Sequence, residues 1–104
     1  MNLLDFGTPF SATATHATAA DATVAADANK THIITDILVS SDKAGAIALV
    51  KNGSTTVIQL QVGAANFGHH FQTPIVCTKG SAVSVSIDGT SACKANVTGR
   101  TIDS

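Results

Sequence analysis

Two adjacent histidines stand between two phenylalanines in the stretch FGHHFQTPIVC, which runs from Phe67 to Cys77. Imidazole and thiolate groups are the usual ligands of zinc, so the stretch has the residue types of a metal site. Neighbouring side chains on an extended segment point to opposite faces, however, so His69 and His70 are badly placed to share one ion. The other candidate ligands occur singly along the chain: His16, His32 and Cys93.

We therefore expect no metal and no cofactor, because a zinc site needs four ligands at short spacings. One of the paired histidines is expected to face inward or a subunit contact, and the other to lie in solvent. Cys77 and Cys93 share the phase of inward-facing residues and are expected to be buried, free thiols; a disulfide would require neighbouring strands. The chain lacks a GxSxG motif, a recognisable Cys-His motif and a phosphate-binding glycine loop, so we expect no enzymatic activity.

The composition limits the classes of partner. The chain of 104 residues has no Trp or Tyr, four Phe, 12% charged residues and a formal net charge of −1. Without a cluster of Lys or Arg we expect no nucleic-acid binding, and no apolar run is long enough to span a membrane. The N-terminus lacks the basic region of a signal peptide, so synthesis in a cytoplasm is expected. The few charges and many small residues suit a protein packed against other subunits, although an isolated Thr-rich β domain is the alternative.

The hydrophobic pattern predicts an all-β fold without helices. The segment at 31–40 is apolar on both of its faces, which predicts cover on both sides. Asn52-Gly53 predicts a hairpin between its flanking strands. Residues 1–10 are expected to form an arm, since Gly7 and Pro9 interrupt it, and 11–104 a single β-sandwich domain. The expected strands are 12–19, 22–27, 31–40, 46–51, 55–62, 81–88 and 92–98.

The last two of these strands are predicted to form a hairpin. Opposed residues of paired strands share a face, so the register must bring apolar residues together. A three-residue loop at 89–91 meets this condition, because it places Ile87 opposite Cys93, Val85 opposite Ala95 and Val83 opposite Val97. A two-residue turn would instead place Val85 opposite Lys94.

The order of segments over residues 20–100 resembles a known class of proteins. TVAADANKTHIITDILVSS is followed by KNGSTTVIQLQV, then by FxTPIVC and KGSAVSVSIDGTSACKANVTGR. This order resembles the small β-sandwich proteins of tailed bacteriophage virions, including jelly-roll decoration (cement) proteins. Related sequences often carry an aromatic residue where this chain has Arg100. The resemblance implies a jelly roll of about eight strands that acts without catalysis, as a homotrimer bound to the major capsid protein on the outer surface of the shell.

Two groups of residues are candidates for subunit or capsid contacts. Phe67 and Phe71 are expected to anchor apolar contacts, and an apolar arm is expected to reach a neighbour or else to be a disordered terminus. A receptor- or carbohydrate-binding tip of a tail or neck fibre is the alternative function. Sugar sites commonly use aromatic platforms, which a chain without Trp and Tyr lacks. The candidate interface residues are Leu3, Leu4, Phe6, Phe10, Phe67, His69, His70 and Phe71.

Overall fold

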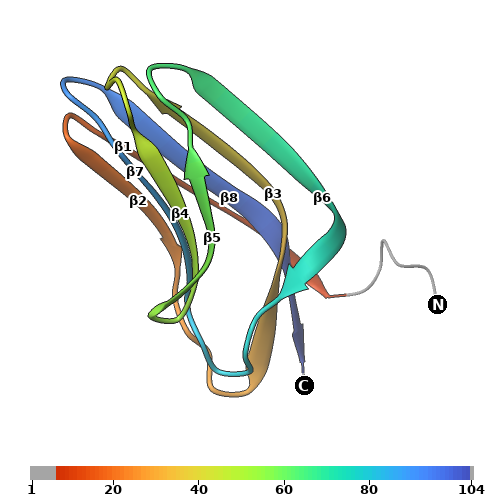
Figure 1. The fold of residues 1–104 in the computed structure, drawn as a ribbon. Coiled ribbons are helices and arrows are strands. Elements are labelled where there is room, and N and C mark those ends of the chain that lie inside the picture. The colour runs from red at the N-terminus through yellow and green to blue at the C-terminus, as the bar shows by residue number, and fades with distance from the viewer. Residues whose placement is uncertain (1–6, 104) are drawn as a thin grey trace.

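The computed structural model describes residues 7–103, which fold into two packed antiparallel β-sheets without any helix (Figure 1). No helix in this part of the chain is long and apolar enough to cross a membrane. The strands are β1 (Thr8–His16), β2 (Ala19–Val24), β3 (Lys30–Ser41), β4 (Ile47–Asn52), β5 (Thr55–Gln61), β6 (Asn66–Val76), β7 (Val83–Asp88) and β8 (Cys93–Asp103).

The strand order is that of a jelly roll. One sheet has the order β1-β8-β3-β6 and the other has the order β2-β7-β4-β5. Nearly every connection therefore crosses from one sheet to the other, and only β4 and β5 are joined by a hairpin. Its loop is Gly53-Ser54, as the Asn52-Gly53 pair predicted, and Gly53 adopts the positive φ of 62° that the turn requires. The expected all-β sandwich of about eight strands is confirmed.

The predicted hairpin between 81–88 and 92–98 is wrong. β7 pairs with β2 and β4, whereas β8 pairs with β1 and β3 in the opposite sheet. The prediction of which residues face inward was nevertheless right. Val83, Val85 and Ile87 all face the core, as do Cys93, Ala95 and Val97. Two strands with one apolar face each can bury those faces side by side or across a sandwich. The alternation alone does not distinguish these arrangements.

A β-bulge in β3 corrects the expectation that this strand needs cover on both sides. The register shifts between Ile34 and Asp36, and the shift turns Ile34, Ile37 and Val39 toward the same core. The hydroxyl of Thr35 in the bulge has two acceptors within hydrogen-bond distance, Oδ2 of Asp36 (2.8 Å) and the carbonyl of Thr98 (3.2 Å). The apolar residues of the segment were assigned to two faces because the bulge is invisible in the sequence.

Gly99 lets β3 approach β8 closely beside this bulge. It lies opposite Ile34 on β8, and a Cβ atom at Gly99 would stand 1.9 Å from the carbonyl oxygen of Ile33. The same atom would lie 2.7 Å from the ring of Phe10, which packs over the glycine. Glycine is required here by the close approach of β1 and β3, rather than by a positive φ.

The N-terminal strands begin earlier than expected. Thr8 pairs with Thr101, so the last three residues of the expected arm 1–10 belong to β1. The predicted strands 12–19 and 22–27 are correspondingly displaced, and Nδ1 of His16 accepts the backbone amides of Thr18 (3.1 Å) and Ala19 (3.3 Å) in the turn between β1 and β2. The remaining predicted arm residues, Leu3, Leu4 and Phe6, lie outside the described residues.

Candidate interaction site

The two long edges of the sandwich differ. At one edge β1 packs along β2, and the short Ala17-Thr18 turn joins them. At the other edge β5 and β6 barely touch, and Figure 1 shows β6 standing apart from β5 below the loop that connects them. We call the two edges the closed edge (β1 and β2) and the open edge (β5 and β6).

The open edge leaves large apolar side chains partly exposed. Those of β5 and β6 that face inward pack against the core, yet none is fully buried. By contrast, Val50 and Val83 in the middle of the same sandwich are fully buried. Phe67 and Phe71 pack against the core of the chain itself, and their part in subunit or capsid contacts stays a prediction. The partly buried residues of the open edge are Ile58, Leu60, Phe67, Phe71 and Ile75, and Val62 lies in the loop that joins the two strands.

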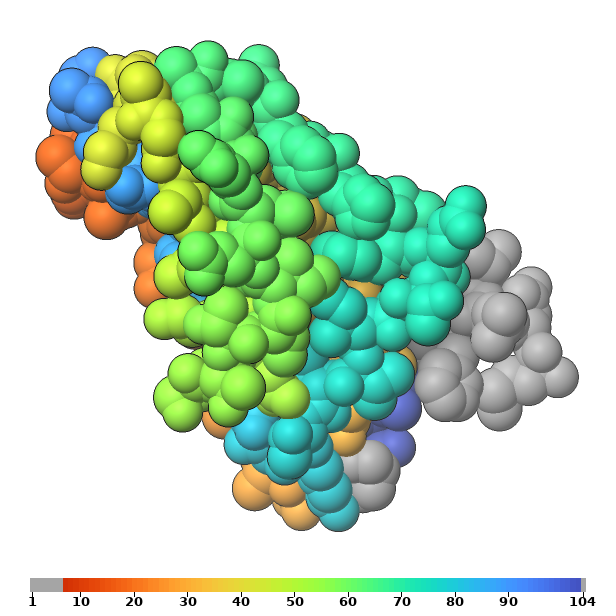
Figure 2. Space-filling view, in the orientation of Figure 1, coloured from red at the N-terminus to blue at the C-terminus, as the bar shows by residue number. Residues whose placement is uncertain are grey.

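The open edge also lacks charge. No Asp, Glu, Lys or Arg occurs between Lys51 and Lys79, so β5 and β6 carry no ionisable side chain except those of His69 and His70. Figure 2 shows that the chain from β5 (green) to β6 (teal) forms a broad face of the molecule. Edge strands commonly carry charged side chains that prevent association with other chains. Neither strand of this edge has that protection.

The two predicted histidines lie on opposite faces of β6, as expected. The His69 ring lies between two aromatic rings: it stacks on Phe67 (6.2 Å between centroids) and meets Phe71 edge-on (4.7 Å). His70 points outward, and its Nδ1 donates to Oδ1 of Asp36 at 2.7 Å. Burial acts to raise the pKa of Asp36, but the hydrogen bonds from His70 and Thr35 outweigh it and hold the pKa below its usual value.

The structure therefore brings three of the predicted interface residues together, namely Phe67, His69 and Phe71. His70 belongs to the outer face of the same strand. Phe10 is separate from them, because it lies on β1 at the far side of its sheet and packs edge-on against the ring of His32 (5.5 Å).

The remaining candidate ligands are dispersed and structural. His32 is buried, its Nε2 donates to the carbonyl of Ala25 (2.8 Å), and its Nδ1 forms a hydrogen bond with the hydroxyl of Thr101 (2.7 Å). No group of three His, Cys, Asp or Glu within residues 7–103 is arranged to hold a metal ion. The sequence offered no sign that His32 is a core residue, because its neighbours Thr31 and Ile33 do not identify an inward face.

Cys77 and Cys93 are free and buried, as predicted. The amide of Cys77 donates to the carbonyl of His32, and Cys93 pairs with Ser41. These partners stand nine residues apart on β3, which corresponds to roughly 30 Å along an extended strand. A disulfide between them is therefore excluded, since it needs Cα atoms within about 7 Å. Burial also raises the pKa of the Cys77 thiol.

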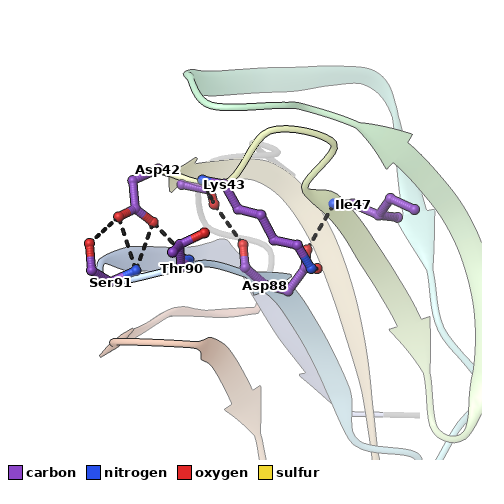
Figure 3. Close-up of polar contacts among 7 residues, drawn as sticks. Asp42, Lys43, Ile47, Asp88, Thr90 and Ser91 are labelled. Carbon is purple, nitrogen blue, oxygen red and sulfur yellow. Dashed lines mark hydrogen bonds and ion pairs between the residues drawn. The ribbon is translucent and has the colours of Figure 1, made fainter.

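A polar cluster that the sequence did not reveal joins the two sheets at one end (Figure 3). Asp42, just after β3, accepts the amides of Thr90 (2.9 Å) and Ser91 (3.0 Å) and the hydroxyl of Ser91. The Ser91 hydroxyl and then these amides hold the pKa of Asp42 far below its usual range. Lys43 forms a 2.6 Å ion pair with Asp88, whose carboxylate also accepts the amide of Ile47 (2.9 Å).

We call this cluster the clasp, because it ties the β3–β4 turn to the β7–β8 loop. Both oxygens of Asp42 and both of Asp88 are occupied by internal donors. Carboxylates that are engaged in this way fix a loop in place and are poorly available for ligands or for proton transfer.

Two shallow hollows lie on the outer faces of the sheets. The hollow on the β2-β7-β4-β5 sheet is largely apolar and is lined by Ala19, Ile47, Leu49, Gln59, Ser86, Ile87 and Asp88. The hollow on the other sheet is more polar and is lined by Thr15, Ser40, Ser41, Asp42, Asn66, Ala92, Cys93 and Lys94. Both are open to solvent, unlike the enclosed clefts that hold small molecules.

No protein-family model matches the chain, and no curated protein matches it. Among solved structures, one of infectious bursal disease virus (Gx strain) aligns with 94% of this chain and 30% of its own, at 15% identity and a TM-score of 0.36. A second, of the Gt strain, aligns with 93% of this chain and 31% of its own, at 17% identity and a TM-score of 0.30. This chain thus spans under a third of each matched chain, and such loose likenesses add nothing to the topology described above.

Proposed function

We propose that this protein is a non-enzymatic structural subunit of a virion, a decoration protein that binds the outer capsid surface as a homotrimer. The open edge is the observation that carries the proposal. It presents partly buried apolar side chains on two uncharged strands, which is what a subunit needs in order to pack against other subunits.

The placement on a virion has a separate support. The jelly roll occurs in viral capsid domains but also in lectin domains and cupins, so the fold by itself does not assign a function. The order of segments over residues 20–100, which resembles phage decoration proteins, favours the capsid among these uses. The strand order observed here is compatible with that resemblance.

The proposed action is mechanical. The described chain is an elongated sandwich of 44 × 24 × 19 Å whose core is rich in Ala and Val, so it buries little apolar surface by itself. Each large apolar side chain that becomes buried at a contact contributes about 1.5–3 kcal/mol. A trimer that touches several capsomers at once adds weak contacts into strong binding, because each further contact forms within an already bound complex.

The test compares virions with and without the protein. Particles that lack it are expected to release their genome at a lower temperature than complete particles while adsorbing normally to cells. Adding back the purified protein should restore the higher temperature. Unchanged particle stability combined with lost adsorption would contradict the proposal and would favour a fibre tip.

The alternative function, a receptor- or carbohydrate-binding fibre tip, has one observation in its favour. The hollow on the outer face of the β1-β8-β3-β6 sheet presents the hydroxyls of Thr15 and Ser40, the amide of Asn66 and the ammonium group of Lys94. Such groups can hydrogen-bond to sugar hydroxyls. The adjoining apolar surface is Leu38, which is 49% exposed, rather than an aromatic platform. Retention on immobilised host glycans, and its loss in Asn66→Ala, would support this alternative.

A further inference from the structure

We infer that the open edge is the surface through which one copy of this chain packs against the next copy in the assembly. The inference deepens the proposed function and rests on it, because it assigns the subunit contact to β5 and β6 rather than to the predicted arm or the outer faces of the sheets. The partner is a second copy of this chain.

Charge favours a second copy over a nucleic acid or an acidic peptide. The outer faces of the sheets carry charged residues, for example Asp21 on β2 and Lys94 and Arg100 on β8. The open edge has none between Lys51 and Lys79, so two such edges meet without repulsion between like charges. A nucleic acid or an acidic peptide would find no basic group on this edge other than its two histidines.

The shape of β6 indicates how the copies meet. Ile75 pairs with Ile34 and His70 pairs with Asp36, so residues 71–74 of β6 bulge out opposite Thr35 alone. Figure 1 shows the corresponding bend in β6. The bulge contains Pro74, which has no N–H group to donate. A long continuous sheet across the contact is therefore blocked, and the contact is made mainly by side chains around Phe67, His69 and Phe71.

His69 and His70 provide a matched pair of positions for a test. They are adjacent in the sequence, both are exposed, and they point to opposite faces of β6. Lysine at 69 places a permanent charge between the rings of Phe67 and Phe71 at the open edge. Lysine at 70 places the same charge on the outer face, where it can still pair with Asp36.

The experiment measures the molar mass of the wild type, His69→Lys and His70→Lys by sedimentation equilibrium at several concentrations. We expect trimers for the wild type and His70→Lys, and at least a tenfold weaker association for His69→Lys. Circular dichroism melting curves establish that all three variants are folded. A folded His69→Lys that associates as tightly as the wild type, or a wild type that is monomeric at all concentrations, would overturn the inference.

A second measurement does not depend on any substitution. Hydrogen exchange of the wild type is compared at low and high concentration, and the amides of residues 66–70 should become more protected at high concentration. The amides of β2 at the closed edge should not change. Protection that grows at β2 and not at β6 would overturn the inference.

The two proposals fail in different ways. If His69→Lys remains a trimer while the wild type binds capsid shells, the open edge is not the contact but the decoration function stands. If His69→Lys is monomeric and the wild type does not bind shells, the contact is assigned correctly and the decoration function is wrong.

Discussion

The closed and open edges are built from side chains of different size. At the closed edge β1 and β2 face the core mainly with alanines, namely Ala12, Ala14, Ala20 and Ala22, and with the larger Phe10 and Val24 at the end away from the β1–β2 turn. Small side chains let the two strands approach closely, so Ala20 and Ala22 are almost fully buried without help from another chain. At the open edge the inward apolar residues are the larger Phe, Ile and Leu, and they remain partly exposed.

The difference explains the low-complexity stretch ATATHATAADATV at residues 12–24. Alanines alternate with polar residues there because one face closes the sandwich and the other meets solvent. The same small sandwich is thus complete at one edge and incomplete at the other. The comparison implies that stability of the single chain depends on the closed side, and association depends on the open side.

The largest expected effect is a difference in unfolding free energy between alanine substitutions at two glycines. Gly99→Ala, beside the closed edge, drives a Cβ into backbone atoms of β3 and should cost about 3 kcal/mol of unfolding free energy or more. Gly68→Ala, at the open edge, meets the flexible end of Leu38 at 3.3 Å and the carbonyl oxygen of Ile37 at an ordinary 3.8 Å, and should cost below about 1 kcal/mol. Urea denaturation measures both, and equal losses would contradict the comparison.

The next largest effect is a difference in stability between alanine substitutions at two histidines. His32→Ala removes two hydrogen bonds and a buried ring, and we expect a loss of about 2–4 kcal/mol. His69→Ala removes an exposed ring and should change the stability of the monomer by less than about 0.5 kcal/mol. Thermal unfolding of dilute protein tests the pair, and a destabilised His69→Ala would show that the open edge supports the monomer.

The clasp predicts a dependence of stability on pH. Asp42 and Asp88 have pKa values below the ordinary 3.8, so each stabilises the folded protein above that pH. This stabilisation is lost as the pH falls from about 4 toward the lowered pKa values. Melting temperatures measured from pH 7 to pH 2 should drop in that range, and Asp42→Asn should drop less. A wild-type melting temperature that stays constant down to pH 2 would contradict this role.

The smallest effect concerns the thiols. Cys77 and Cys93 are both buried, and burial raises the pKa of Cys77, so the nucleophilic thiolate is scarce. A thiol reagent added to native protein should react slowly, and both groups should react after denaturation without any reductant. Rapid labelling of Cys77 in the native protein would contradict this expectation. It would show that the thiol next to the end of β6 is more exposed than in the structure.

The sequence predicted the strands better than their arrangement. The alternation in 83–88 and 93–97 was read correctly, because a period of two reports which residues face inward. It does not report whether two inward faces lie in one sheet or in two, so the hairpin between β7 and β8 was wrong. The bulge at Thr35 and the clasp at Asp42 depend on contacts between residues far apart in the chain.

The site was predicted in part. The aromatic stretch around His69 was identified from its composition, whereas the grouping of β5 with β6 at one edge needed the topology. The absence of charge between Lys51 and Lys79 is visible in the sequence. It bears on association because the structure places both uncharged strands at the same edge of the sandwich.

The proposal of a decoration protein is tested most directly by locating the protein on purified virions. Electron cryomicroscopy of complete particles, and of particles that lack the protein, gives a difference map. The proposal predicts density on the outer capsid surface, arranged as three sandwiches whose β5 and β6 edges face one another. Density confined to the tail or its fibres, or no density on the particle, would contradict it.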